Sequence, residues 1–438
     1  MSDTDDLRHM LDTIEGQRGR LAHYREHMRG EQATAYLSAR SRDALDSRLK
    51  RLAVNAPRLV VKSITERLTV AGFRREGESH ADAALWDRWR RAGMIARSSL
   101  IHADRALYGA AYVTVWGTER GRATVTGDSP LNMAVDLDPA TGETLLAVRR
   151  WNSRKGSHAV VFGPDGITPW NAQGQDAPSG SGAWRRGETV PNPYGVVPVV
   201  PFIRRESTDD VTGTSIVADI VDLSDALGKV LQDALVTSEY FARPRRWATG
   251  LEVEEDADGN PIDPFANDRK LVSEAPDTKF GQLESSGVDG YTDLTATFWQ
   301  QIGALTGLPP HYLGLHGDQP ASAEGTRSAE SQLTSTAYAE QRQLDEPWAL
   351  VSALMEAIET ESDPEDHMRV SPVWKSPEIR TPSQASDAAV KLDGMGVPLR
   401  ALLVDPLGYS PEDADRIVTE QRADRLNRAG TDLERLLP

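Results

Sequence analysis

The chain has 438 residues, a formal net charge of −17 at pH 7 and no cysteine. This length suffices for two or three domains with their own cores, and the missing cysteines exclude disulfides, thiolate metal sites and a cysteine nucleophile. The acidity disfavours tight wrapping of DNA, because phosphates repel a negatively charged surface. No apolar run reaches the ~20 residues that span a bilayer, and the acidic start MSDTDDLRHM is unlike a secretory signal. We therefore expect no membrane partner, and a protein of the cytoplasm or assembled there.

The first 108 residues carry mostly helical periodicity. Apolar side chains recur at roughly helical spacing over 4–29, and a second helical block covers about 38–54. Pro57 marks the start of a third helix, because proline fits the first helical turn, where its missing N–H is not needed. Amphipathic patterns then predict helices at about 80–92 and 95–107.

The period then changes to that of β-strands. Between 110 and 203, short runs rich in valine, threonine and aromatic residues alternate with turn signals such as DPATGE and GPDG, which predicts an antiparallel meander. The composition of 171–182 is that of a flexible loop. Pro198 and Pro201 cannot donate to a strand ladder, so the last strand is expected at an edge.

Two helices separated by an insert come next. A heptad-like apolar stripe predicts a helix over 215–241, roughly 40 Å long at ~1.5 Å per residue, and Pro244 stops it. A mixed insert at 242–285 leads to a helix at about 290–306. The apolar stripe has a second edge, so the first helix needs neighbours on two sides, as the subunits of a ring provide. An oligomer is therefore plausible from the residues alone.

The last part of the chain begins with a loop rich in proline and glycine, ALTGLPPHYLGLHGDQPASAEGTRSAESQL. A helix is expected after it over about 325–360, with a kink near Pro347 because an interior proline removes a hydrogen bond. A Pro-rich linker at 371–382 then precedes short helices over 383–438.

Few motifs carry recognisable chemistry. HYREH places His23 and His27 on one helical face beside Glu26, which fits a metalloprotease signature, but a solvated helix face is favoured because no third ligand is apparent. DADGNP (256–261) departs from a calcium loop and is read as a turn. RPRRW (243–247) suits a salt-bridged or partner-binding segment better than nucleic acid. No P-loop or nucleophile elbow occurs. We expect no enzyme, no metal and no cofactor; the alternative is a metal-dependent hydrolase built on HxxEH.

Four tryptophans lie at helical spacing among apolar residues. Such residues are more often part of a core than of a binding platform. The core is therefore expected to contain Trp86, Trp89, Trp299 and Trp348.

Six stretches in one order resemble the portal proteins of tailed double-stranded DNA bacteriophages, most of all the siphovirus portal family of actinobacterial phages. They are RLKRLAVNAPRLVVKSITERLTVAGFR (48–74), LIHADRALYGAAYVTVW (100–116), NPYGVVPVVPFIRR (192–205), SEYFARPRRWATG (238–250), IGALTGLPPHYLG (302–314) and SDAAVKLDGMGVPLRALLVDPLGYSPE (386–412). The resemblance covers nearly the whole chain and is weakest at 251–275.

The resemblance implies an α+β portal fold with a mainly helical wing, an antiparallel β meander, long stem helices, a small clip insert and a helical crown. The implied segments are a wing (1–214), a first stem helix (215–241), a clip (242–285), a second stem helix (286–307), a tunnel loop (308–325), a kinked helix returning to the wing (326–370), and a linker with the crown (371–438).

The resemblance also implies functional residues. Those of the tunnel loop, which would face DNA, are His311, Tyr312, Leu313, Leu315, His316, Asp318, Gln319, Ser322, Glu324 and Arg327. Those of the clip, which would dock partners, are Arg243, Arg245, Arg246, Trp247, Lys270 and Lys279. Those of stem packing are Ile220, Leu223, Leu227 and Leu231.

The partners that follow from this resemblance are about eleven further copies in a ring of about twelve subunits, the terminase large subunit, a head-tail adaptor, the major capsid and scaffolding proteins, and double-stranded DNA passing through the channel. The expected location is one vertex of the capsid in the virion, with assembly in the host cytoplasm. A separate terminase would supply the motor, since the chain has no nucleotide-binding motif.

Overall fold

The structure is a computed structural model. It describes residues 3–33, 53–78, 80–118, 120–179, 182–242, 246–250, 277–282, 289–315, 323–378 and 381–436. The chain divides into two compact units. The first unit comprises Met1–Gln32, Asn55–Val221 and Ile302–Pro438, and the second comprises Ala33–Val54 and Asp222–Gln301. None of the helices in the described ranges is both long and apolar enough to cross a membrane.

Four helices open the first unit where the sequence predicts them: α1 (Asp3–Arg29), α3 (Ala56–Thr65), α4 (Ala83–Arg91) and α5 (Met94–Tyr108). Pro57 lies in the first turn of α3, as expected. Asp82 caps α4 by accepting hydrogen bonds from the backbone N–H groups of Ala84 and Leu85. The predicted helical block at 38–54 lies almost entirely outside the described residues.

One strand pair was not predicted. β1 (Val70–Arg75) follows α3, and β13 (Val370–Trp374) pairs with it antiparallel. The prediction of a linker at 371–382 was therefore wrong for its first residues. Their β-branched and aromatic side chains could be recognised as a strand only with the partner, almost 300 positions earlier, in view.

The predicted meander forms two antiparallel sheets. One has the order β10-β2-β3, from β2 (Ala110–Gly117), β3 (Ala123–Asp128) and β10 (Val199–Ile203). The edge position of the proline-containing strand is thus confirmed. The other sheet contains β4 (Met133–Leu137), β5 (Thr144–Ser153), β6 (Gly156–Phe162), β7 (Gly166–Ala172) and β8 (Arg185–Arg186), and β9 (Val190–Pro191) also pairs with β7.

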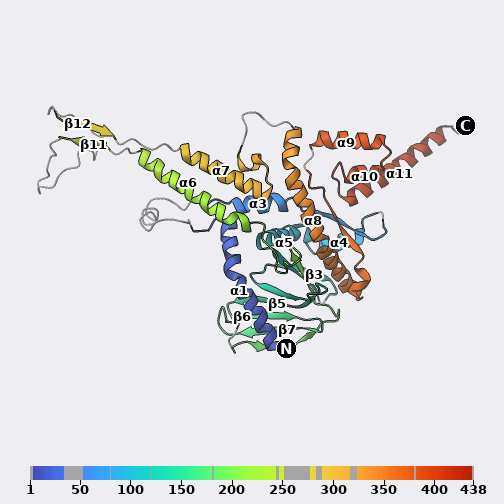
Figure 1. The fold of residues 1–438 in the computed structure, drawn as a ribbon. Helices are drawn as coiled ribbons and strands as arrows, with labels where there is room; N and C mark the ends of the chain where they lie inside the picture. The colour runs from blue at the N-terminus through green and yellow to red at the C-terminus, as the bar shows by residue number, and fades with distance from the viewer. Residues whose placement is uncertain are drawn as a thin grey trace. The chain divides into compact units, whose positions relative to one another are not determined.

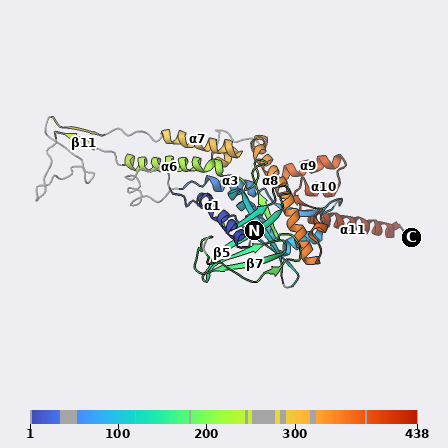
Figure 2. The ribbon, with the colours of Figure 1, turned by 60° about the horizontal axis from the view of Figure 1, so that its bottom comes forward.

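Helix α1 lies along one face of the larger sheet (Figures 1 and 2). Its apolar stripe packs against inward-facing side chains of β4 to β7, and this core contains Leu7, Met10, Leu11, Ile14, Ala134, Val148, Ala159 and Trp170. A second cluster joins the larger sheet to the smaller one: Ala110, Tyr112, Met133, Ala147, Phe162, Val197 and Val199. The larger sheet is therefore covered on both faces.

The centre of the first unit is aromatic. The Trp348 ring, fully buried, lies 4.8 Å from the Trp89 ring and 4.5 Å from the Phe202 ring, measured between centroids. Its indole N–H donates to His102 Nε2 at 2.9 Å. Complete burial lowers the pKa of His102 to about 3, with the charge of Arg105 adding to the effect, so this histidine is neutral. The core interpretation is confirmed for Trp89 and Trp348, whereas Trp86 and Trp299 are half-buried.

Helix α8 (Ala323–Thr360) crosses this centre and contains Pro347, past which it continues. Two buried glutamates on it bind arginines from other elements. Glu340 pairs with Arg105 of α5 and, at 2.8 Å, with Arg204 after β10. Glu356 pairs with Arg75 at 2.8 Å and with Arg88 at 3.0 Å. These ion pairs connect α4, α5, β1 and the segment after β10 to helix α8.

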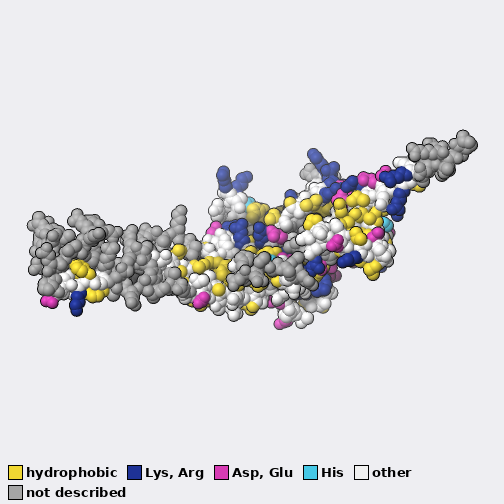
Figure 3. Space-filling model, turned by 90° about the horizontal axis from the view of Figure 1, so that it is seen from above, with side chains coloured by type: hydrophobic (Ala, Val, Ile, Leu, Met, Phe, Trp, Pro, Cys, Tyr) yellow, Lys and Arg dark blue, Asp and Glu magenta, His cyan; other side chains and the backbone are white. Residues whose placement is uncertain are grey.

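The chain ends in helices, as predicted. After η3 (Pro364–His367) come α9 (Pro382–Gly394), α10 (Leu399–Val404) and α11 (Pro411–Leu436). A capping box between Thr381 and Gln384 begins α9. Helix α11 has 26 residues, so the expectation of short helices was wrong for it. Hydrophobic side chains on this part of the surface, among them Val390 and Met395, are exposed (Figure 3).

The second unit contains most of α6 (Val221–Ala242) and α7 (Asp289–Thr306), with the two-stranded ladder of β11 (Arg246–Thr249) and β12 (Lys279–Gln282) between them in sequence. The predicted start of the first helix at 215 was wrong. Ser215 Oγ donates to the Leu107 carbonyl at 2.5 Å, and Ile216 N donates to the Ala106 carbonyl at 3.0 Å. These bonds satisfy the C-terminal carbonyls of α5 and delay the helix until after η1 (Ala218–Ile220).

Candidate functional site

The paired helices of the second unit are the first candidate. Helices α6 and α7 run side by side in both ribbon views (Figures 1 and 2), and the Thr237 and Tyr291 hydroxyls lie 3.1 Å apart between them. At ~1.5 Å per residue, the 22 residues of α6 extend about 33 Å, shorter than the sequence predicts.

The four predicted packing residues have different surroundings. Leu227 is fully buried in the single chain, and Ile220 is buried within the 3₁₀ turn that precedes the helix. Leu223 and Leu231 are half-buried. Only the last two therefore retain surface with which another chain could pack, and the exposed Leu235, which the sequence reading did not include, adds to it.

The ladder of β11 and β12 carries exposed aromatic side chains. Trp247 faces Gly281 across the ladder, and a Cβ added at Gly281 would lie 2.4 Å from the indole ring. Glycine is thus needed there for the tryptophan to lie flat on the neighbouring strand. Phe280 is exposed on the opposite face of the ladder, because it is one position along.

The predicted clip residues fall partly on this ladder. Trp247 and Lys279 are exposed on it. Arg246 begins β11, but its side chain lies outside the described parts of the structure. Also outside them are Arg243, Arg245 and Lys270.

The segment after α7 is the third candidate. Gly307 ends the helix with φ +69° and Gly314 ends η2 (Pro310–Leu313) with φ +71°, both in the left-handed region that favours glycine. Leu313 folds back onto the last turn of α7, where a Cβ on Gly303 would lie 2.6 Å from its Cδ1. The three glycines of IGALTGLPPHYLG thus have separate steric roles.

The structure places the predicted tunnel residues in two groups. His311, Tyr312 and Leu313 belong to η2, and Leu313 is buried, so it cannot line a channel in this conformation. Leu315 is half-buried and Arg327 is exposed. The remaining predicted residues have no described side chain: His316, Asp318, Gln319, Ser322 and Glu324. The prediction for them stays a prediction.

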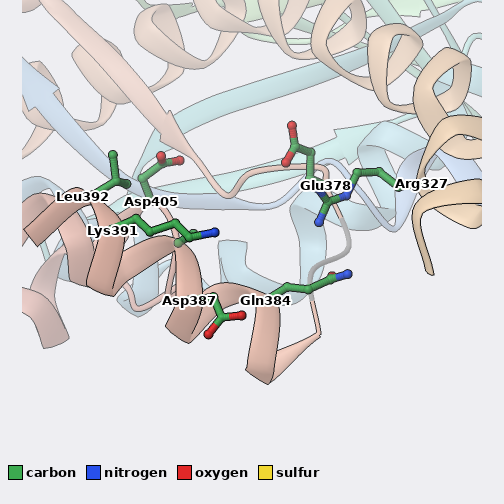
Figure 4. A pocket seen from close by; sticks show the side chains of 8 residues that line it. Arg327, Glu378, Gln384, Asp387, Lys391, Leu392 and Asp405 are labelled. Atoms are coloured by element: carbon green, nitrogen blue, oxygen red, sulfur yellow. The ribbon is translucent and has the colours of Figure 1, made fainter. Parts of the chain in front are cut away.

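Arg327 lines an open cleft of about 540 Å³ between the start of α8, the segment before α9, and α9 and α10. Figure 4 shows Arg327 next to Glu378, with Gln384 and Lys391 of α9 across from them. Asp387 and Asp405 add two more carboxylates. Side chains of both charges therefore line this cleft. Apart from Arg327, sequence reasoning missed it, because its walls come from segments about 50 residues apart.

The HYREH motif lies in the last third of α1. His27 is buried and its Nδ1 is 2.9 Å from the His23 carbonyl oxygen, so this ring nitrogen is engaged with the backbone. His23 and Glu26 are exposed. The alternative of a metal-dependent hydrolase built on this motif stays a prediction.

Two carboxylates are electrostatically coupled between α5 and β3. Burial raises the pKa of Asp104 to about 6, and the nearby charge of Asp128 adds to it. Burial also raises the pKa of Asp128, although Arg149, 2.9 Å away, opposes the shift. Because burial raises both pKa values, the pair makes the stability of the fold depend on pH.

Comparisons with known proteins identify the family. The model of the family described as phage portal protein, SPP1 Gp6-like, matches residues 5–424. The chain is 28% identical over 384 residues to the portal protein of Mycobacterium phage L5, covering 83% of this chain and 77% of that protein. It is 29% identical over 405 residues to the portal protein of Mycobacterium phage D29, covering 86% and 81%.

Solved structures give weaker matches. The neck of an empty gene transfer agent particle matches with a TM-score of 0.49 and 14% identity, over 83% of this chain and 91% of that chain. The virion of a native gene transfer agent particle matches with a TM-score of 0.47 and 15% identity, over 78% and 85%.

With a family model that matches almost the whole chain, the chain belongs to the phage portal protein family. The resemblance found in the sequence is thereby confirmed, and so is the α+β class of the fold.

Proposed function

We propose that this portal protein forms a ring of about twelve copies at one vertex of the capsid, and that double-stranded DNA enters and leaves the head through the ring. The match to the portal family over residues 5–424 carries this proposal. The division of the chain into two units supports it, because the second unit, with its paired helices and two-stranded ladder, is inserted in sequence between segments of the first unit.

The proposed segments follow the element boundaries. The wing comprises the helices and sheets up to 214, together with β13 and most of α8. Helices α6 and α7 form the stem, and the ladder of β11 and β12 belongs to the clip. The crown begins at α9, near 382, rather than at 371, because Val370–Trp374 is a strand of the wing.

The proposed contacts are assigned to these segments. Leu223 and Leu231 of the stem pack against neighbouring copies, since they keep exposed apolar surface in the single chain. Trp247 and Lys279 of the clip meet a terminase large subunit and a head-tail adaptor, because exposed aromatic side chains are enriched at protein interfaces. Capsid and scaffolding proteins would contact the outer surface of the wing.

The charge of the chain suits a conduit that must not hold its cargo. Contacts between basic side chains and phosphates contribute strongly to DNA affinity: a protein that neutralises 6–10 phosphates loses a factor of about 10³–10⁵ in affinity when the salt rises from 50 to 200 mM. With a net charge of −17, the ring would repel phosphates at most positions. Residues 315–325, with Arg327 beside them, are the proposed narrowest part of the bore.

Electron microscopy of the purified full-length protein tests the proposal. Negative-stain images should show rings with a central hole, and light scattering should give the mass of about twelve chains of 47.9 kDa. A monodisperse monomer or dimer at micromolar concentration, without rings, would contradict it.

Deletion of Gly317–Ser322 tests the tunnel loop separately. We expect rings of unchanged mass, because this segment lies beyond η2 and before α8, and heads that package or retain DNA poorly. The control is deletion of Gln173–Gln175, three exposed residues of the loop after β7, which should leave packaging unchanged. Full heads with normal DNA from the Gly317–Ser322 deletion would overturn the assignment.

A further inference from the structure

The two ends of the segment between α7 and α8 meet on the body of the first unit. On the side of α7, Gly307 approaches α8 so closely that an added Cβ would lie 2.8 Å from Gln332 Cγ. Four residues later, His311 Nε2 lies 3.5 Å from Glu330 Oε1. The chain from Gly307 to His311 therefore lies against Glu330 and Gln332 of α8.

One buried side chain lies between both ends. The Arg67 guanidinium donates to the Tyr312 hydroxyl at 3.1 Å, and the same nitrogen is 3.9 Å from Glu330 Oε2. Its carbon Cζ lies 5.8 Å from the centroid of the Tyr312 ring, within the range of a cation–π contact. Arg67 thus contacts η2 on one side of the segment and α8 on the other.

Arg67 is itself held in place. It follows α3, is 8% exposed, and donates through its other terminal nitrogen to the Ser63 carbonyl at 2.8 Å. Its own carbonyl accepts a hydrogen bond from Gln341 Nε2 of α8 at 3.2 Å. A buried guanidinium is costly without partners, so these bonds fix the side chain in one orientation.

We propose that Arg67 is a positioning residue for the segment that joins η2 to α8: it holds Tyr312 and Glu330 at the same end of α3 and so fixes the spacing of the two elements that the segment connects. The relevance of this segment to DNA rests on the proposed function, whereas the contacts of Arg67 do not. Holding both ends of a segment at one point removes most of the conformational freedom of those ends.

Three predicted tunnel residues belong to η2 and have contacts within the first unit. Tyr312 contacts Arg67, His311 lies near Glu330, and Leu313 is buried. Tyr312 and Arg67 are 245 positions apart. No local pattern connects them, so only the folded chain reveals their common role.

Hydrogen exchange of the assembled full-length protein tests the fastening. Arg67→Met keeps the length of the side chain but removes its charge and donors. We expect amides of 311–315 and 325–330 to exchange about tenfold faster or more, since hydrogen bonds of charged groups contribute about 1.5–3 kcal/mol and 1.4 kcal/mol is tenfold. Amides of α1 and the larger sheet should be unchanged.

Milder variants and a matched control complete the design. Tyr312→Phe removes one hydroxyl and Glu330→Gln removes one charge, and each should accelerate exchange in the same segment by a smaller factor. Arg58→Met, an exposed arginine of α3, should have no effect. Unchanged exchange in the segment for Arg67→Met and Tyr312→Phe would overturn the proposal, whatever the ring does.

A second measurement separates the positioning role of Arg67 from the proposed role of the segment in contacting DNA. DNA retention in heads built with Tyr312→Phe should fall relative to Arg58→Met. Faster exchange with normal retention would leave the fastening correct and show that the loop is not the part that meets DNA. Faster exchange with impaired retention supports both.

Discussion

Replacement of Glu340 by glutamine tests the buried ionic contact at the centre of the first unit. The side chains of Glu340 and Arg105 are 5% and 1% exposed, and Arg204 approaches the other carboxylate oxygen at 2.8 Å. Removing one partner of a buried ion pair typically costs about 3–5 kcal/mol, because the remaining charge stays buried. Two arginines depend on this one carboxylate, yet each has another acceptor: Gln343 Oε1 at 2.7 Å for Arg105, and Glu206 at 2.6 Å for Arg204.

We therefore expect the lower end of that range, about 3 kcal/mol, for Glu340→Gln. Urea unfolding followed by tryptophan fluorescence reports this unit, since Trp348 lies two turns away on α8. At a slope of about 3 kcal/mol/M, the midpoint should fall by about 1 M. All variants must be compared at one protein concentration, because assembly adds to apparent stability.

The matched control is Glu346→Gln, an exposed glutamate of the same helix, which should stay within about 0.5 kcal/mol of the parent. A midpoint for Glu340→Gln equal to that of the control would refute the reasoning. It would mean that the neighbouring acceptors replace the carboxylate fully, or that water reaches the pair.

Three further predictions concern other parts of the chain. Folding raises the pKa of Asp104 to about 6, so the folded state keeps a proton that the unfolded state releases near 3.8. The stability that this bound proton provides is lost as the pH rises through about 4 to 6. Asp104→Asn should therefore stabilise the protein by about 1–3 kcal/mol at pH 7.5 and little at pH 4, as urea midpoints at both pH values would show. Gly307→Ala should destabilise the base of the loop by at least about 1 kcal/mol because of its positive φ, measured by local hydrogen exchange, whereas Gly290→Ala, with open space around it, should not. Leu231→Asp should reduce ring formation in size-exclusion chromatography while circular dichroism shows that the chain is still folded. Rings of normal yield would count against the stem assignment. Leu227→Asp cannot separate an assembly defect from a folding defect, since Leu227 is already buried in the single chain.

The local periodicity of the sequence was sufficient to predict the position of many helices and of the β-rich region. The helices α1, α3, α4, α5 and α7 and the β-rich region were predicted close to their observed positions, because amphipathic spacing and proline or glycine at the ends act within a few residues. The family was also within reach of the sequence, since the order of six stretches does not depend on how the chain folds.

Contacts between distant segments decided the rest. The strand Val370–Trp374 was taken for a linker because its partner, β1, lies near the start of the chain. The start of α6 moved to Val221 because Ser215 and Ile216 bond to the end of α5 instead of continuing a helix. Tyr312 accepts a hydrogen bond from a buried arginine 245 positions away, a contact that no local pattern predicts. Hydrogen bonds and burial of this kind depend on what the folded chain brings within a few ångströms, and a linear pattern does not contain that information.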